Sequence, residues 1–244
     1  MALVDAVLEL ADDHLVLGHR VSEWCGHAPI LEEDLAMPNM ALDLIGSART
    51  LYDYAAQLEG KGRSEDDMAY LRDEREYRNC LLVERPNGDF AQTMLRQLYF
   101  AAFMHPYWQA AVASDDAVIA GVAGKAVKEM AYHIRHAGEW VIRLGDGTDE
   151  SARRMAEAVE ELEGYTNELF EEGAAEGVDA LPSREDIRPV WSRTITDIFT
   201  QAGLEFPQER FPQTGGRKGD HGEDLGHMLA EMQSVYRAHP GAVW

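Results

Sequence analysis

The stretch FAQTMLRQLYFAAFMHPYWQAAVA, residues 90–113, decides the fold class. It follows the strong turn signal ERPNGD, and Asp89 with Gln92 has the three-residue spacing of a helix cap. The stretch predicts a single helix of about 24 residues, about 36 Å long at 1.5 Å per residue. Pro106 should kink this helix. Helices of this length are typical of an all-α bundle.

Aromatic residues run down the same predicted helix at helical spacing. They are Tyr99, Phe100, Phe103, Tyr107 and Trp108. Such a stripe is usually part of a core. The predicted helix lacks acidic residues altogether, however, so part of the stripe could instead face another protein. The sequence leaves both interpretations open.

Further helices are predicted on both sides, because apolar residues recur there every three or four positions. Three of them are predicted over residues 2–24, 33–59 and 222–238. Four others are predicted from residues that could cap their first turns: a short helix after Ser64 with Asp67, a helix from Ser114 and Asp115 to Leu144, a helix opened by Thr148, and a helix opened by Ser183 with Asp186. Residues 171–182 and 204–221 are predicted loops. No strand-length alternating segment competes with these helices, so we predict an antiparallel all-α bundle.

Length and composition limit the classes of function. The 244 residues with 45% apolar content favour one domain over 1–244, with the bundle core at about 2–145 and additional helices and a tail at about 149–244. A formal charge of −22 argues against nucleic acid and anionic lipid as partners, and against coenzyme A unless a local basic pocket or another subunit supplies cations. Two cysteines without a CxxC, and no apparent signal peptide or membrane span, predict a cytoplasmic protein.

An oxygen-activating di-iron centre in a bundle needs a Glu from each of two helices and a Glu-x-x-His pair from each of the other two. No Glu-x-x-His occurs in this chain. Residues 28–104 contain no His, and residues 90–114 contain no Asp or Glu. In KEMAYHIRH, Met130 stands three residues before His133, and a thioether is a poor ligand for oxidised iron. We therefore predict no catalytic, cofactor-binding or metal-binding residues in this chain.

Some polar residues could still form a smaller site. Glu129, His133 and His136 share a helix face and could hold one divalent metal, which would make the chain an independent metalloenzyme. The alternative is that they are hydrogen-bonded residues of the bundle or of an interface. Asp224 and His227 have suitable i, i+3 spacing, but a lone pair also fits a helix surface.

Three further groups of residues have two interpretations each. Glu23 and Asp43 could be inward-facing remnants of a carboxylate site, or could pair with Arg or meet solvent. Lys125 and Lys128 could place an ammonium where iron would sit, or could be solvated. TGGRKG, residues 214–219, lacks the spacing of a phosphate loop, and we expect it to dock on a partner.

Four blocks of the sequence resemble the PaaC family of phenylacetyl-CoA oxygenase subunits. They are SEWCGHAPILEEDLA, RDEREYRNCLLVERPNGDF, KAVKEMAYHIRHAGEWVIRLGDGT and TGGRKGDHGEDLGHMLAEMQ. The resemblance implies a ferritin-like four-helix bundle with additional C-terminal helices. It also implies a non-catalytic relative of the PaaA-type subunit, which carries the di-iron centre and has a Glu at the position of Met130.

The same resemblance implies the partners and the reaction. The chain would pair stably with the PaaA-type catalytic subunit. Small subunits, and a reductase that uses NADPH, flavin and iron-sulfur, would complete the complex. The complex would epoxidise the ring of phenylacetyl-CoA in aerobic phenylacetate breakdown, and this chain would serve as its structural subunit.

Overall fold

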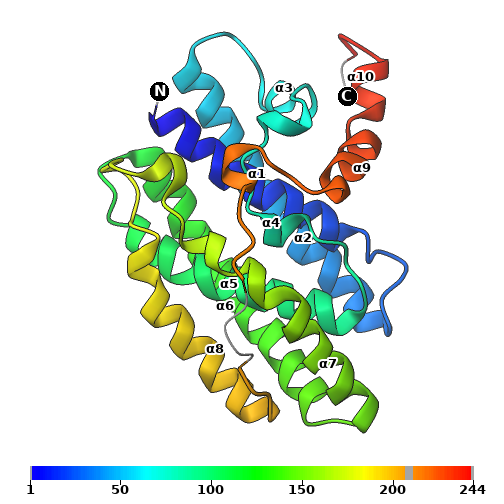
Figure 1. The fold of residues 1–244 in the computed structure, drawn as a ribbon. Helices are drawn as coiled ribbons and strands as arrows, with labels where there is room; N and C mark the ends of the chain where they lie inside the picture. Colours follow the sequence, from blue (N-terminus) through cyan, green and yellow to red (C-terminus); the bar gives the residue numbers. More distant parts are fainter. Residues whose placement is uncertain (1, 207–210, 243–244) are drawn as a thin grey trace.

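Four long helices form the centre of the molecule in the computed structural model, which describes residues 2–206 and 211–242 (Figure 1). They are α1 (Ala2–Ser22), α2 (Leu31–Glu59), α5 (Phe90–Ala111) and α6 (Ala117–Gly145). Helix α1 packs along α2, α5 packs along α6, and α2 also contacts α6. No strand occurs within the described ranges. The fold is a ferritin-like helical bundle, which confirms the predicted fold class.

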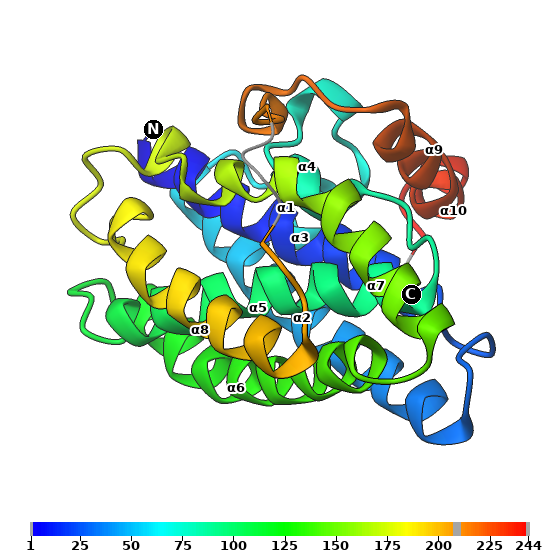
Figure 2. The ribbon, with the colours of Figure 1, turned by 60° about the horizontal axis from the view of Figure 1, so that its bottom comes forward.

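Shorter elements cover the bundle. They are α3 (Glu65–Tyr70), α4 (Leu81–Glu84), α7 (Asp149–Leu162), α8 (Arg188–Ala202), α9 (Glu223–Met232) and α10 (Ser234–Ala238), with 3-10 turns at Glu74–Glu76, Glu163–Tyr165, Asn167–Phe170, Gly173–Ala175, Glu185–Ile187 and Gly216–Lys218. Helices α7 and α8 pack on the α5–α6 pair, whereas α9 and α10 lie beyond α1 and α4 (Figures 1 and 2). None of the helices in the described ranges is long and apolar enough to cross a membrane.

Three predicted helix starts are confirmed by their caps. Ser64 and Asp67 form a reciprocal capping box at α3. The side chain of Asp89 accepts from the amide of Gln92 at α5, and Thr148 caps α7. These caps satisfy amides that have no partner within the helix, which is why polar residues recur at these positions.

The predicted cap of the fourth helix was wrong. Asp116, not Ser114 or Asp115, caps α6 by accepting from the amides of Val118 and Ile119. Ser114 is used differently: its hydroxyl donates to the carbonyl of Ala180 and accepts from the amide of Asp116. The helix therefore begins later than predicted.

Two other predictions near the C-terminus need correction. Ser183 does not cap a helix, because its hydroxyl donates to Glu172, and α8 begins only after the 3-10 turn at Glu185–Ile187. The predicted helix at 222–238 is two helices, α9 and α10, which meet at Gln233. The side chain of Gln233 turns into the protein and donates to the carbonyl of Arg72, at 3.0 Å. Part of the loop predicted at 204–221, residues 207–210, lies outside the described residues.

The aromatic stripe of α5 belongs to the core. Its five aromatic residues are at most 1% exposed, and Trp191 of α8 donates its indole N–H to the carbonyl of Tyr99. The suggestion that part of this stripe faces another protein was therefore wrong. Helix α5 lacks acidic residues because it is surrounded by α6, α7 and α8, where an unpaired carboxylate would be costly.

Candidate functional site

Each of the four long helices contributes one polar side chain to the middle of the bundle. These residues, which we call the bundle centre, are His14 of α1, Asp43 of α2, Gln97 of α5 and His133 of α6. His14, Gln97 and His133 are fully buried, and the side chain of Asp43 is 35% exposed. The arrangement resembles a site that draws on four helices, although the residue types differ from those of a di-iron centre.

His133 is the hub of the bundle centre. The amide nitrogen of Gln97 donates to its Nδ1 at 3.0 Å, and its Nε2 lies 3.3 Å from Oδ2 of Asp43. Because the side-chain N–H of Gln97 donates to Nδ1, the other ring nitrogen, Nε2, is the one that can donate to Asp43. Both ring nitrogens are thus used by protein groups. His133 is held as a link between α2, α5 and α6.

His14 contacts the core differently. Its Nδ1 donates to the carbonyl of Leu10 at 2.7 Å, while Nε2 is buried without a protein partner. The ring packs against Phe100 and Trp108, with centroid distances of 5.3 and 5.8 Å. Burial lowers the pKa of His14, and the nearby His133 lowers it further. His14 is therefore a neutral histidine of the core.

The metal site considered for Glu129, His133 and His136 is contradicted by the geometry. Each side chain has a different partner: Glu129 pairs with Lys125 at 2.9 Å, His133 contacts Asp43 and Gln97, and His136 Nε2 lies 2.8 Å from Oε2 of Glu33. In the described part of the chain, no group of three or more His, Cys, Asp or Glu side chains is placed to hold a metal. These residues are bundle groups, the alternative that the sequence left open.

The donor set of the bundle centre does not fit two iron ions. Gln97 supplies an amide where the third helix would need a carboxylate, and Met130 is buried one turn before His133. Gly46 lies three residues after Asp43 on α2, where a Glu-x-x-His pair would have its His. A Cβ on Gly46 would lie 3.5 Å from Nζ of Lys125. One carboxylate, one amide and two imidazoles therefore replace the six ligands of a di-iron bundle.

The remaining candidates lie outside the bundle centre. Glu23 pairs with Arg20 at 3.0 Å on the surface, as one of its two interpretations expected. Asp43, in contrast, faces inward and contacts His133. Lys125 is 61% exposed and is held by Glu129, and Lys128 is exposed. Asp224 pairs with Arg85 at 3.1 Å, whereas His227 is exposed. The lysines therefore lie at the surface of the bundle.

Comparison with known proteins shows the family of this chain. The family model described as "Phenylacetic acid catabolic protein" matches residues 1–244. The chain belongs to this family. It is 45% identical, over 97% of each chain, to a protein of Escherichia coli (strain K12) that is named as a subunit of the 1,2-phenylacetyl-CoA epoxidase.

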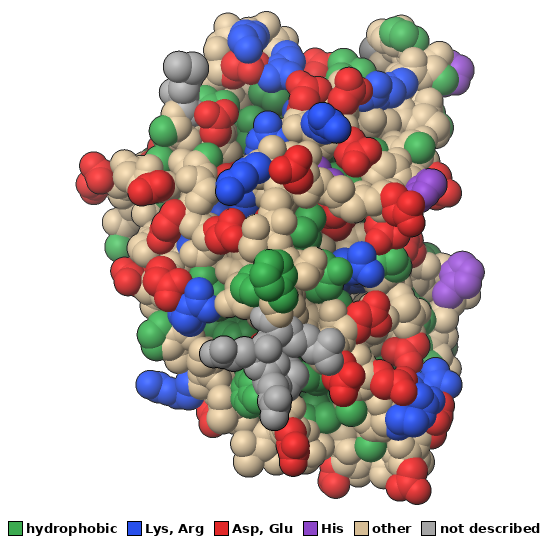
Figure 3. All heavy atoms as spheres, viewed as in Figure 1, with side chains coloured by type: hydrophobic (Ala, Val, Ile, Leu, Met, Phe, Trp, Pro, Cys, Tyr) green, Lys and Arg blue, Asp and Glu red, His purple; other side chains and the backbone are tan. Residues whose placement is uncertain are grey.

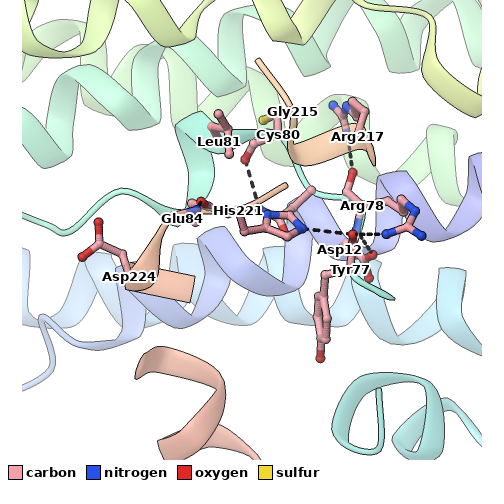
Figure 4. A network of polar contacts seen from close by, with 12 residues as sticks. Asp12, Tyr77, Arg78, Cys80, Leu81, Glu84, Gly215, Arg217, His221 and Asp224 are labelled. Carbon is pink, nitrogen blue, oxygen red and sulfur yellow. Dashed lines mark hydrogen bonds and ion pairs between the residues drawn. The ribbon is translucent and has the colours of Figure 1, made fainter. Parts of the chain in front are cut away.

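A second polar cluster was not predicted from the sequence. On the side of α1 away from the bundle centre, three buried carboxylates each pair with a buried arginine from a distant segment. The pairs are Glu9 with Arg184, Asp12 with Arg72, and Asp13 with Arg217. Asp12 also accepts from the backbone amide of Arg78 (Figure 4). These pairs fasten the outer segments to α1.

The TGGRKG segment packs on its own chain. It belongs to a strap, residues 213–222, that crosses α1 and the turn around Cys80. Arg217 is 6% exposed, and it donates to Asp13 at 2.8 Å and to the carbonyl of Arg78 at 3.0 Å. Glu168 accepts from the amides of Gly215 and Arg217. The predicted docking of this segment on a partner stays a prediction.

The strap ends in a histidine–carboxylate pair. Nδ1 of His221 lies 2.7 Å from Oε2 of Glu84, and Nε2 lies 3.0 Å from the carbonyl of Tyr77 (Figure 4). Burial alone would lower the pKa of His221, but the hydrogen bond and charge of Glu84 raise it above its usual value. His221 is thus favoured in its charged form, as a clamp between the strap and α4.

Proposed function

We propose that this chain is the structural, non-catalytic subunit of a multicomponent phenylacetyl-CoA oxygenase. In this proposal it pairs with a PaaA-type subunit and stabilises it. The E. coli relative is named as a subunit of an epoxidase, which supports a role in phenylacetate catabolism and in a multi-subunit complex. The reaction would be epoxidation of the aromatic ring of phenylacetyl-CoA.

The observation that carries the proposal is the use of His133 by protein groups. In a catalytic bundle this imidazole would bind metal, but here Gln97 and Asp43 occupy its two nitrogens. Di-iron would belong to the partner, while NADPH, flavin and iron-sulfur would belong to the reductase. This chain's own contribution would be a rigid helical surface, because buried pairs and a large core fix its helices.

The proposal is tested by reassembling the complex from separately purified subunits. Omitting this chain should reduce the solubility and the turnover of the PaaA-type subunit. Complexes that contain the Asp43→Asn variant should turn over at the wild-type rate, because Asn keeps the shape of Asp43 and removes only its charge. A catalytic subunit that is equally soluble and active without this chain would contradict the proposal.

A large loss of turnover with Asp43→Asn, in a variant that still folds and assembles, would also contradict it. Such a result would assign chemistry to the bundle centre. Circular dichroism and size-exclusion chromatography would establish folding and assembly. Gln57→Ala, an exposed change elsewhere on α2, serves as the matched control.

A further inference from the structure

Helix α2 exposes a row of leucines. Leu31, Leu35 and Leu42 are 70%, 61% and 67% exposed. Their spacings of four and seven residues place all three within one narrow stripe of the helix surface. Pro38, which is partly exposed, lies between Leu35 and Leu42 on the same side of the helix. Isolated exposed leucines are common, but a contiguous apolar stripe marks an interaction site.

Helix α6 lies beside this stripe and adds a tyrosine and two cations. The pairing of Glu33 with His136 and of Tyr54 with Asp116, close to the N-terminal end of α6, shows that α2 and α6 run antiparallel. This alignment brings Lys128, Tyr132 and Arg135 level with the leucine stripe, on a helix that packs against α2. We define the α2–α6 outer face by these residues: Leu31, Leu35, Leu42, Lys128, Tyr132 and Arg135.

The charge of this face differs from that of the whole chain. Carboxylates also lie beside it: Glu33 pairs with His136, Asp43 with His133, Glu129 with Lys125 and Glu139 with Arg143, while Glu32 is exposed. Lys128 and Arg135 are exposed, and the guanidinium of Arg135 lies 5.4 Å from the centre of the Tyr132 ring. A chain with 44 acidic and 22 basic residues thus presents an apolar stripe beside unpaired cations. An apolar surface bordered by carboxylates would complement this face.

We infer that the α2–α6 outer face binds the catalytic subunit of the complex, through an apolar helical surface with carboxylates opposite Lys128 and Arg135. The inference rests on the proposed function, since it locates the pairing that the function requires. A second copy of this chain is disfavoured as the occupant. Two-fold self-pairing would bring like cations together, and two chains of charge −22 repel each other.

The test measures the dissociation constant between this chain and the PaaA-type subunit. The double variant Leu35→Glu with Leu42→Glu should weaken binding at least about tenfold, because it buries two carboxylates in an apolar contact. Leu58→Glu is the matched control: Leu58 is an exposed leucine on the opposite side of α2 and should bind like wild type. Leu35, Leu42 and Leu58 are all exposed, so the variants should keep the wild-type circular dichroism and melting temperature.

A second variant tests the charge contribution separately. Lys128→Glu with Arg135→Glu should also weaken binding, and should remove much of the salt dependence that wild-type binding shows. Wild-type affinity in the leucine double variant would overturn the assignment of this face. Self-association of the isolated chain that disappears in the same variant would assign the face to a second copy instead. If the wild-type chain did not bind the PaaA-type subunit at all, the proposed function itself would fail.

Discussion

Arg72 makes two kinds of buried contact at the scale of a single residue. Its guanidinium pairs with Asp12, which is fully buried, and lies 4.3 Å from the centre of the Tyr77 ring. It also donates to the carbonyl of Met68 at 2.6 Å. A buried ion pair adds little net stability when it is intact, but losing one member leaves the other charge uncompensated.

We therefore expect Arg72→Met to lower the free energy of unfolding by about 3–5 kcal/mol, measured by urea denaturation. The double variant Asp12→Leu with Arg72→Met should recover part of that loss, because neither charge of this ion pair remains. Arg153→Met is the control, since Arg153 pairs with Glu150 at the surface and should leave stability unchanged. A loss in Arg72→Met no greater than in this control would contradict the account.

His221 gives the chain a pH-dependent contact. Its raised pKa means that the folded state binds this proton more tightly than the unfolded state, where imidazole titrates near pH 6.5. The stabilisation is complete below pH 6.5 and is lost as the pH rises through the folded-state pKa.

The stability advantage of wild type over His221→Gln should therefore be largest below pH 6.5 and should shrink at higher pH. Urea denaturation of both proteins across this range measures the difference. The lowered pKa of His14 acts in the opposite direction, losing stability as the pH falls, but it is present in both proteins and cancels. An advantage that grows as the pH rises would contradict the raised pKa.

Single residues of the site were only partly predictable from the sequence. His133 and the missing Glu at Met130 could be identified because both lie on one helix face. The partners of His133 could not, because Gln97 and Asp43 are 36 and 90 positions away in the sequence and meet it only through packing. His14 was missed because nothing near it in the sequence distinguishes a core histidine from a surface one.

At the scale of the element, the strap depends on closely packed glycines, of which Gly216 lies nearest to the backbone of another segment. A Cβ on Gly216 would lie 2.2 Å from the carbonyl oxygen of Asn79 and 3.2 Å from the amide of Leu81. These are backbone atoms, which cannot move aside as a flexible side chain can. Glycine is therefore required where the strap crosses the turn around Cys80.

We predict that Gly216→Ala lowers the free energy of unfolding by about 1–3 kcal/mol, as expected for overpacking. Limited proteolysis should also cut the strap faster than in wild type. Gly121→Ala is the control, because a Cβ there has open space and alanine favours the helix. A Gly216→Ala variant as stable and protease-resistant as wild type would show that the strap is not closely packed.

Elements were more predictable than contacts. Caps at Ser64, Asp89 and Thr148 depend on neighbours three residues away, so the local sequence specifies them. Helix α6 begins later than predicted because the hydroxyl of Ser114 does not cap it. That hydroxyl donates to the carbonyl of Ala180, which is 66 positions away in the sequence. The packing of the strap on its own chain was missed for the same reason, since Arg217 meets Asp13 across 204 positions.

At the scale of the whole molecule, charge and fold have separate roles. Figure 3 shows carboxylates spread over one face, with arginines and lysines among them. Inside the molecule, Arg72, Arg184 and Arg217 are matched to carboxylates of α1, so these buried charges cancel in pairs and most of the acidic residues lie at the surface. The bundle has a ferritin-like four-helix frame, and at its centre Gln97 and Asp43 hold His133.

The central claim is that this frame does not assemble a di-iron centre. Iron content of the separately purified chain, produced with excess iron and measured by mass spectrometry, tests that claim most directly. We predict far less than one iron per chain, unchanged in His133→Ala. Two irons per chain, bound tightly and lost in His133→Ala, would contradict the account.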